Sequence, residues 1–466
     1  MQEQASHEKQ ARKFITMTTQ PVEKLIVQLA IPTMISMMIT SIYNMADTFF
    51  VGQISGGSAE ATSATAAVGV AFPLMAVIQA FGFMFGHGSG NFISRALGSQ
   101  KTDEAERMAA TGFFMALIAG TLIGAVGLIF LEPLVRLLGS TDTILPYAKS
   151  YIRLILIGCP WMTASLVLNN QLRFQGNALF AMIGIGSGGL INMALDPLLI
   201  FGLNMGIQGA ALATIISQLI SFCLLYIGTW KSDNLKIRIK NFTPKPYYFA
   251  EIFRGGAPSL FRQGIGSVAS TVLNNAAGAF GDPAIAAMSI VSRVMMFANS
   301  LVIGFGQGFQ PVCGFNYGAK KYDRVRRGYA FCVKYSTVFL ICAAALGAVF
   351  APSVLSWFRG DDPEVIRIGA LALRLQCITL PSFGFIMISN MMMQTTAYTF
   401  QASMTALARQ GLFFLPLIVV FPMLWGLFGI QLAQPVADGL TFLLTILMQR
   451  NVMRQIKRLE MENAGK

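Results

Sequence analysis

The sequence predicts an all-α membrane protein of about twelve transmembrane helices, arranged as two pseudo-symmetric six-helix lobes with a central cleft. Three observations favour this class. Only 12% of the 466 residues are charged and 54% are hydrophobic, whereas roughly 25% of the residues in a soluble domain are charged. The apolar residues come in runs of about 20, the length at which a helix crosses the hydrocarbon of a bilayer. The second half of the chain also repeats the first.

Runs of apolar residues between charged, glycine or proline breaks define the twelve expected spans. They cover residues 25–50, 64–88, 108–132, 146–170, 178–203, 207–229, 256–280, 284–309, 328–352, 366–388, 395–422 and 427–449. An even number of spans places both chain ends on one side of the membrane. Residues 1–24 lack the apolar centre and cleavage site of a signal peptide, so we expect the first span to be retained.

The placement of the basic residues predicts which side holds the chain ends. The formal net charge is +13, and most Lys and Arg residues fall in the tails and the even-numbered loops. The odd-numbered loops offer little more than Arg136 and Arg359. The positive-inside rule therefore predicts a multi-pass protein of the cell inner (plasma) membrane with both termini cytoplasmic. The same scattering of basic residues, without a basic domain or interleaved aromatics, argues against a nucleic-acid partner.

The reactive residue types are sparse, so neither an enzyme nor a bound cofactor is expected. The six cysteines are scattered without a CxxC pair, which argues against a disulfide framework or a zinc site. The two histidines, His7 and His87, are far apart in the sequence. No nucleophile, base and orienting residue converge in a recognisable motif.

A gapless offset of 220 residues relates the two halves of the chain. The matched positions include Ala66-Ala67 with Ala286-Ala287, Gly88 with Gly308, Gly98 with Gly318, Lys101 with Lys321, Asp103 with Asp323, Arg107 with Arg327, Asn170 with Asn390, Gly206 with Gly426, and Gly209 with Gly429. The common glycines and alanines of membrane helices do not explain the paired loop charges. We therefore predict an internal repeat.

The longest polar stretch lies between the two repeats and divides the chain. The predicted organisation is a cytoplasmic tail at 1–24, an N-terminal lobe at 25–230, a cytoplasmic linker at 231–254, a C-terminal lobe at 255–449 and a basic tail at 450–466. Six helices return each repeat to the side on which it started, so both lobes have one orientation. Parallel repeats of this kind occur in transporters, in which rocking lobes expose a central cleft alternately to each side.

Two acids within the expected spans are the first candidates for function, because charges in lipid are costly. Asp47 and Asp196 each lie ~27–33 Å from the cytoplasmic start of their spans at a rise of ~1.5 Å per residue. Asn192 is four residues before Asp196, and Pro197 loosens the backbone by removing an N–H donor. This chemistry suits binding of Na⁺ or exchange of H⁺. The alternatives are a satisfied acid at a helix kink for Asp196 and an interfacial carboxylate for Asp47.

The C-terminal lobe carries its own charged residues in or near spans, and for most of them structural pairing or snorkelling is the preferred interpretation. These residues are Arg262, Arg293, Lys334, Arg374, Arg409 and Asp438. Arg262 is the exception, because its neighbours in APSLFRQGIG are glycine and proline. The residues that we assign to the substrate cleft are Tyr43, Asn44, Tyr151, Arg262, Gln263 and Met295.

Four segments together resemble the multidrug and toxic compound extrusion (MATE) family, over about residues 25–450. They are YNMADTFFVG, SRALGSQK, NMALDPLLIFGLNMGIQGAALATIISQ and FGQGFQPVCGFNYGAKKYDRVRRG. The resemblance implies two six-helix lobes, a central cleft, and export of amphipathic, often cationic drugs in exchange for Na⁺ or H⁺.

Carried over residue by residue, the resemblance implies an ion-coupling site in the N-terminal lobe. Its members are Asp47, Asn169, Asn192, Asp196 and Thr214, of which Asp47, Asn192, Asp196 and Thr214 would be the Na⁺ ligands. The seventh expected span lacks the acid that another branch uses in the C-terminal lobe. The match is therefore closer to the bacterial branch that couples through the N-terminal lobe.

The sequence thus predicts a secondary active multidrug efflux antiporter that works as a monomer. Its expected partners are small-molecule drugs or toxic organic cations and the membrane lipid. The hypothesised mechanism bends the first and fifth helices near Pro32 and Pro197 when an ion neutralises the acids. One alternative is a flippase for a lipid-linked oligosaccharide, which needs a basic cleft. Another is a non-transporting receptor, which leaves the duplicated lobes unexplained.

Overall fold

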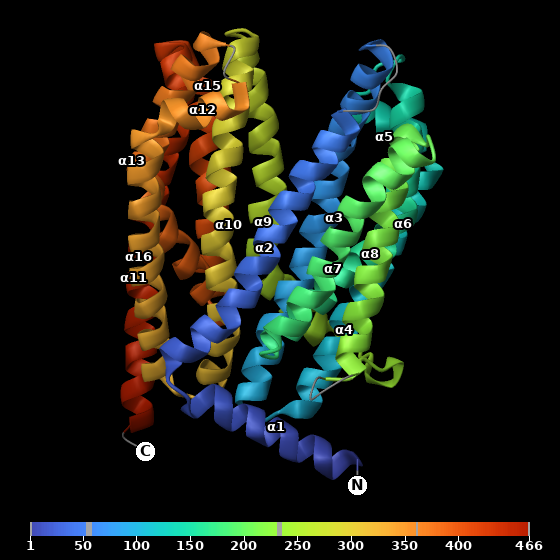
Figure 1. Cartoon of the computed structure of the whole chain (residues 1–466). Helices are drawn as coiled ribbons and strands as arrows, with labels where there is room; N and C mark the ends of the chain where they lie inside the picture. Colours follow the sequence, from blue (N-terminus) through green and yellow to red (C-terminus); the bar gives the residue numbers. More distant parts are fainter. Residues whose placement is uncertain (1, 53–57, 231–234, 360–361, 465–466) are drawn as a thin grey trace. The chain divides into compact units, whose positions relative to one another are not determined.

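The computed structural model describes residues 2–52, 58–230, 235–359 and 362–464, except the side chains of 2–9, 44, 45, 47–49, 52, 58–65, 359 and 464. Helices are the regular elements of this described part (Figure 1). Hydrocarbon offers the peptide backbone no hydrogen bonds, and a helix satisfies its own N–H and C=O groups. The all-α fold predicted from the apolar runs is therefore confirmed.

The first half of the chain contains α1 (Gln2–Thr19), α2 (Val22–Gly52), α3 (Ser58–Gly98), α4 (Thr102–Ile129), α5 (Leu131–Leu137), α6 (Leu145–Phe174), α7 (Ala178–Pro197), the π-helix η1 (Leu198–Gly202), α8 (Gly206–Trp230) and the 3₁₀-helix η2 (Ile239–Asn241). The second half contains α9 (Pro246–Gly278), α10 (Asp282–Gly318), α11 (Tyr322–Val349), α12 (Ala351–Arg359), α13 (Pro363–Thr395), α14 (Thr399–Leu407), the π-helix η3 (Ala408–Phe414), α15 (Leu415–Trp425) and α16 (Leu427–Ala464).

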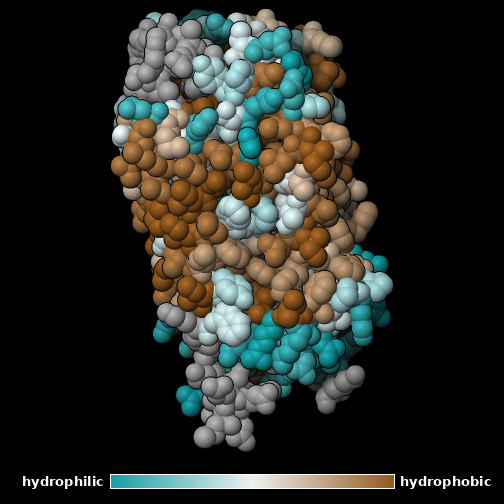
Figure 2. All heavy atoms as spheres, turned by 90° about the vertical axis from the view of Figure 1, so that its right-hand side faces the viewer, coloured by the Kyte–Doolittle hydropathy of each residue, from teal (hydrophilic) through white to brown (hydrophobic). Residues whose placement is uncertain are grey.

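Eleven stretches of the described chain are long and apolar enough to cross a membrane, against the twelve expected. They include no part of α9, although α9 has 33 residues, because its sequence is richer in charged and amide side chains such as Arg262 and Asn274. On the face shown in Figure 2, a broad hydrophobic band lies between hydrophilic residues at the two ends. The chain is a multi-pass membrane protein.

The chain forms two compact units whose division falls inside α2 and α9. Unit 1 comprises Met1–Met17 and Ile35–Gly256, and unit 2 comprises Thr18–Met34 and Ala257–Lys466. The predicted lobes, in contrast, were divided at the linker 231–254. Within this segment the described residues from Leu235 onward belong to unit 1, and α9 already begins at Pro246. The predicted tail 1–24 likewise contains α1 and the start of α2.

Glycines explain why the first half of α2 belongs to unit 2. A Cβ at Gly308 would lie 2.4 Å from the Ala30 Cα, and a Cβ at Gly304 would lie 2.8 Å from the Met34 Cα. The two glycines are four residues apart on α10, so they form one small face on which the α2 backbone packs. In unit 1, a Cβ at Gly88 would similarly lie 2.1 Å from the Ile252 backbone oxygen.

The internal repeat is visible in the backbone of the two units. α4 and α11 begin and end at the same offset of 220 residues, as do the left-handed residues Gln100 and Lys320, with φ of 60° and 57°. Each unit also has one central helix. α6 packs against α3, α4 and α8 in unit 1, and α13 packs against α10, α11 and α16 in unit 2.

The register of the repeat shifts by one residue between the ends of α6 and α13. Asn169 Nδ2 donates to the Ala181 backbone oxygen at 2.9 Å, and Asn390 Nδ2 donates to the Ala402 oxygen at 2.6 Å. The structural counterpart of Asn390 is therefore Asn169. The sequence pairing of Asn390 with Asn170 was wrong, because a gapless offset cannot follow an insertion.

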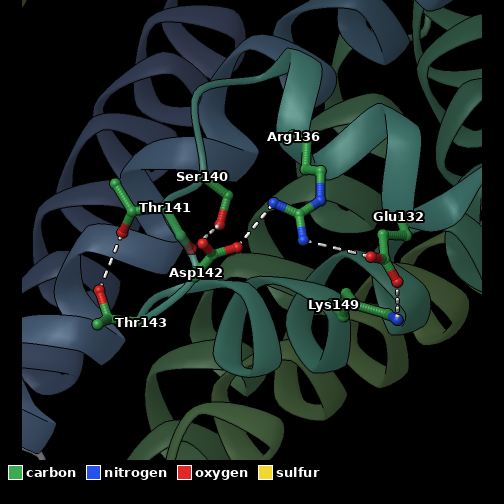
Figure 3. Close-up of polar contacts among 7 residues, drawn as sticks. All are labelled: Glu132, Arg136, Ser140, Thr141, Asp142, Thr143 and Lys149. Atoms are coloured by element: carbon green, nitrogen blue, oxygen red, sulfur yellow. Dashed lines mark hydrogen bonds and ion pairs between the residues drawn. The ribbon is translucent and has the colours of Figure 1, made fainter.

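One of the two basic residues expected in odd-numbered loops is neutralised locally. Arg136 of α5 donates to Asp142 at 2.8 Å and to Glu132 at 3.4 Å, and Lys149 donates to Glu132 at 2.9 Å (Figure 3). The hydrogen bond and charge of Lys149, followed by those of Arg136, lower the pKa of Glu132. Both basic residues of this network therefore have carboxylate partners, and the predicted orientation of the chain stays a prediction.

Candidate functional site

A break in the regular α-helical backbone directly follows Asp196. α7 ends at Pro197 and continues as the π-helix η1, in which the Leu203 N–H donates to the Leu198 oxygen at 2.9 Å. Proline has no N–H with which to bond the residue four positions earlier, so the regular helical ladder cannot continue through it. Short π-helices of this kind are frequent at functional sites. The loosening expected at Pro197 is present.

Asp196 and Asn192 form a buried polar pair on one face of α7. Asp196 is 0% exposed and Asn192 is 2% exposed. Asn192 Nδ2 donates to Asp196 Oδ1 at 3.4 Å, as the spacing of four residues allows. Asn192 Oδ1 is also buried and has no hydrogen-bond partner among the described atoms. An unsatisfied buried acceptor costs roughly 1–3 kcal/mol, which a bound cation or a protonated acid beside it would offset.

Thr214 of α8 and Asp196 of α7 lie at similar distances from the loop that joins these two helices. Asp196 precedes Gly202 by six residues and Thr214 follows Gly206 by eight, or ~9 and ~12 Å along the two helices. The Thr214 hydroxyl donates to the Ala210 oxygen at 3.1 Å, so its own oxygen remains able to accept or to coordinate. The two helices pack against each other. Thr214 is therefore compatible with a site around Asp196.

Asp47 and Asn44 lie in α2, and their side chains are outside the described residues. The backbone of α2 nevertheless runs beside α7, because a Cβ at Gly189 would lie 3.1 Å from Tyr43 Cδ1. Asp47 follows Tyr43 by four residues, and Asn192 follows Gly189 by three. This places the Asp47 backbone level with the Asn192–Asp196 turn. Tyr43 packs on α7 beside the candidate site.

Asn169 does not belong to this cluster. Its side chain bonds Ala181 near the start of α7, and Asp196 lies 15 residues beyond Ala181, roughly 22 Å along the helix. Asn169 instead joins α6 to α7 close to the turn between them. The resemblance implied that Asn169 belongs to the ion-coupling site. This distance corrects that placement, since one coupling site cannot include both ends of α7.

The other cleft candidates fall into two groups. Tyr151 is 1% exposed in the apolar core of unit 1, and Met295 is 9% exposed in the core of unit 2. Both are packing residues, contrary to expectation, because their helix faces turn inward. Arg262 Nη1 donates to Asn390 Oδ1 at 3.2 Å, which ties α9 to α13 within unit 2. Gln263 is half-buried next to it.

One buried polar group escaped the sequence analysis, and a second is a structural pairing of the kind expected for the charged residues of the C-terminal lobe. Arg173 is 2% exposed and donates to Asn170 Oδ1 at 2.6 Å, with His87 Nε2 3.3 Å from the same guanidinium. Arg409 of η3 pairs with Asp438, to which Gln434 also donates. The spacings of three and four residues, Asn170–Arg173 and Gln434–Asp438, were the available signals.

Among the described side chains, no three His, Cys, Asp or Glu residues come together. A cation at Asp196 would therefore be held by one described carboxylate with amide, hydroxyl and backbone oxygens. Oxygen ligands of this kind suit a hard cation better than a thiol- or imidazole-seeking metal. The arrangement can also exchange a proton, because burial favours the neutral form of a carboxylic acid.

Comparisons with known proteins agree with this architecture. The MatE family model matches residues 32–198 and again residues 258–420, one match in each repeat. Multidrug export protein MepA of Staphylococcus haemolyticus (strain JCSC1435) is 27% identical over 417 residues, which cover 89% of this chain and 90% of that protein. MepA of Staphylococcus aureus (strain MSSA476) is 25% identical over 92% of this chain and 93% of its own length.

Solved structures share the fold over nearly the whole chain. A crystal structure of MATE in complex with MaL6 has a TM-score of 0.88 and 25% identity, and covers 95% of this chain and 99% of that chain. An outward-facing multidrug resistance MATE family transporter of the MOP superfamily also has a TM-score of 0.88 and 25% identity, over 95% and 98%. A MOP superfamily transporter from Pyrococcus furiosus, described as having a binding pocket of reverse polarity, has a TM-score of 0.87 and 25% identity, over 95% and 98%.

Proposed function

The chain belongs to the MatE family, and from this premise we propose that it is a secondary active antiporter that exports amphipathic, often cationic compounds. Relatives named multidrug export proteins that cover about nine-tenths of the chain support export of drugs. The observation that carries the proposal is the buried Asp196–Asn192 pair at the start of η1. A fully buried acid beside a loosened helix can change charge and backbone geometry together.

We propose that H⁺ or Na⁺ is the coupling ion and that it binds at Asp196, Asn192 and Thr214, together with Asp47 of α2. An ion that arrives from outside neutralises the acids and satisfies the Asn192 oxygen. The conformation that binds the ion better is then favoured in proportion to its differential affinity. Bending of α2 at Pro32 and of α7 at Pro197 would transmit this change, because proline interrupts the helical hydrogen bonds there.

The proposed setting is the plasma membrane, with both termini cytoplasmic and the monomer as the transporting species. The basic residues of the tails and even-numbered loops support this orientation. Methionine and aromatic side chains would bind the exported compounds, because these side chains adapt to flat, apolar molecules. The supply of 26 methionines and 36 phenylalanines is consistent with broad specificity.

The experiment that tests the proposal is flux of a lipophilic cationic dye into or out of proteoliposomes under separately imposed pH and Na⁺ gradients. Antiport predicts that the dye moves in the direction opposite to the inflow or outflow of the coupling ion. An ionophore that collapses the gradient of this ion should stop the dye movement. Empty liposomes and a gradient of K⁺ alone serve as controls. Dye flux that responds to neither gradient would overturn the proposal.

A flippase for a lipid-linked oligosaccharide of the wider superfamily is less well supported. Such a protein needs free basic groups for an anionic pyrophosphate. Arg262 is engaged with Asn390, and Arg374 donates to the Ala348 oxygen at 3.1 Å. A third arginine of the C-terminal lobe, Arg293, is exposed and makes no such contact within the described part of the chain. A single arginine does not make the basic cluster that the alternative requires.

A further inference from the structure

A cavity of about 210 Å³ opens on unit 2 between α2, α10 and α11. Its walls are hydrocarbon and aromatic carbon, with Ile31 and Met34 from α2, Phe305 from α10, and Phe339 from α11. The one hydroxyl on an aliphatic side chain in the lining, that of Ser336, donates to the Val333 oxygen at 3.2 Å. The cavity therefore suits a saturated chain and offers almost nothing to a polar ligand.

The packing of the three helices explains the cavity, which we call the α2–α11 groove. α2 lies against the glycine face of α10, and α11 touches α2 where a Cβ at Gly328 would lie 3.0 Å from Val22 and 3.2 Å from Ile26. Further along α11 the residues that line the cavity are large, Tyr335 and Phe339, and the groove lies between them and α2.

The groove faces the hydrocarbon of the membrane. Ile31 and Tyr335 are each 52% exposed and Phe339 is 42% exposed. The remaining outer face of α11 is equally apolar, with Val338 and Leu346 more than half exposed. A water-filled surface would not tolerate this many exposed apolar side chains in one stripe, so lipid is what contacts them.

Two lysines flank the cytoplasmic part of the groove. Lys334 is exposed beside Tyr335, with its ammonium nitrogen 5.9 Å from the centre of that ring. Lys24 is exposed on α2, three residues before Val27 and seven before Ile31, and therefore on the groove side. Neither lysine forms an ion pair with a carboxylate of the described residues, whereas the neighbouring Arg327 pairs with Glu23 at 3.4 Å.

The depth of Lys334 favours an anionic partner. It lies twelve residues into α11, roughly 18 Å from the basic turn that precedes the helix. An ammonium group this far into a lipid-facing helix is costly unless it snorkels to the headgroup layer and meets an anion there. The phosphate of a phospholipid is the anion that a bilayer supplies at this level.

We propose that the α2–α11 groove binds an anionic phospholipid of the cytoplasmic leaflet, with one acyl chain in the groove and its headgroup between Lys24 and Lys334. The two positive charges disfavour the lipophilic cations that the protein is proposed to export. The occupant is therefore a resident lipid, and the site is separate from the coupling residues of unit 1. The proposal stands whether or not the protein is an antiporter.

Native mass spectrometry of the full-length protein with phosphatidylglycerol and with phosphatidylcholine of the same chain length tests the proposal. The wild type should retain phosphatidylglycerol in preference, and the double variant K24Q/K334Q should lose roughly a hundredfold in affinity for it, since hydrogen bonds to charged groups are each worth about tenfold in affinity. R293Q, which removes an exposed arginine of α10 away from the groove, should retain wild-type binding. Val27→Trp, which fills the groove, should weaken binding of both lipids.

Thermal unfolding with added phosphatidylglycerol vesicles gives a second measurement that is independent of retention in the gas phase. The stabilisation seen for wild type and R293Q should shrink in K24Q/K334Q. Equal retention of the two lipids by the wild type, or unchanged phosphatidylglycerol affinity in K24Q/K334Q, would overturn the proposal. Displacement of the lipid by a lipophilic cation would also overturn it, because the groove would then belong to the exported compounds.

Discussion

Arg409 and Asp438 form an ion pair in unit 2, with Arg409 Nε donating to Asp438 Oδ1 at 2.8 Å. The arginine comes from the π-helix η3 and the acid from α16. Gln434 Nε2 donates to the same carboxylate oxygen at 2.8 Å, and the guanidinium lies 4.6 Å from the centre of the Phe383 ring. Each unit thus places an acid near a π-helix. In unit 2 a cation of the protein itself satisfies the acid.

This pairing predicts that Asp438 serves stability and not coupling. Asp438→Asn would leave the Arg409 charge largely buried without its carboxylate, which should destabilise the protein by roughly 3 kcal/mol. Thermal unfolding in detergent measures the loss. Arg367→Gln, which breaks the exposed Arg367–Glu364 pair, should cost less than about 1 kcal/mol. A D438N protein of wild-type stability, with ion-driven flux abolished, would assign the coupling role to unit 2.

Asp196 should behave in the opposite way. Asp196→Asn keeps the shape of the side chain and removes the titrating group, so the protein should fold while ion-driven dye flux falls to the level of empty liposomes. Asp323→Asn, in the first turn of α11, is the matched control, and this variant should transport normally. Full flux in D196N under both a pH and an Na⁺ gradient would refute the role of Asp196.

Asp47 is expected to share this phenotype in cells. Asp47→Asn should abolish drug resistance while the protein remains in the membrane at its normal level, because one of the two carboxylates among the proposed ion ligands is lost. Growth in a graded series of drug concentrations, with membrane content measured by immunoblot, checks the result. Undiminished resistance at equal expression contradicts the coupling role of Asp47.

Much of the fold follows from local features of the sequence. Apolar runs and charge placement predict the helices, and the pairing of Asp103 with Asp323 predicts the repeat. The division of α2 between the units could not be predicted. The glycines at 304 and 308 indicate that another helix packs closely on α10, but they do not identify that helix as α2. The span 256–280 was predicted within α9, although polar residues such as Arg262, which bonds to Asn390, keep α9 out of the eleven apolar stretches.

The candidate site was predictable where its members are neighbours on one helix. Asn192, Asp196 and Pro197 follow from spacing alone. Asn169 was misplaced by resemblance, although counting from the α6–α7 turn shows that it is far from Asp196 in depth. Tyr151 was assigned to the cleft because nothing in the residue type distinguishes a cleft-facing tyrosine from a core one.

The small face of α10 gives a prediction about packing. Gly308→Leu would drive a side chain into the Ala30 backbone, so the first half of α2 could not pack on unit 2. We expect a large loss of folded protein, measured as the monodisperse fraction by size-exclusion chromatography. Gly439→Leu on α16 is the control, because nothing lies within 4 Å of a Cβ at that position. Equal yields for the two variants would show that the contact is dispensable.

The loop network around Glu132 gives a prediction about pH. The pKa of Glu132 is lowered in the folded protein, first by the hydrogen bond and charge of Lys149 and then by those of Arg136. A lowered pKa stabilises the paired loop above the ordinary glutamate pKa of about 4.3, and the stabilisation is lost as the pH falls through the lower folded value. Lys149→Gln should therefore raise the pKa of Glu132 toward its ordinary value, as measured by carboxyl NMR. In the same titration, K101Q should leave the pKa of Glu132 unchanged, since Lys101 pairs with Glu104 instead. A Glu132 titration that is identical in wild type and K149Q would show that the contact does not hold in solution.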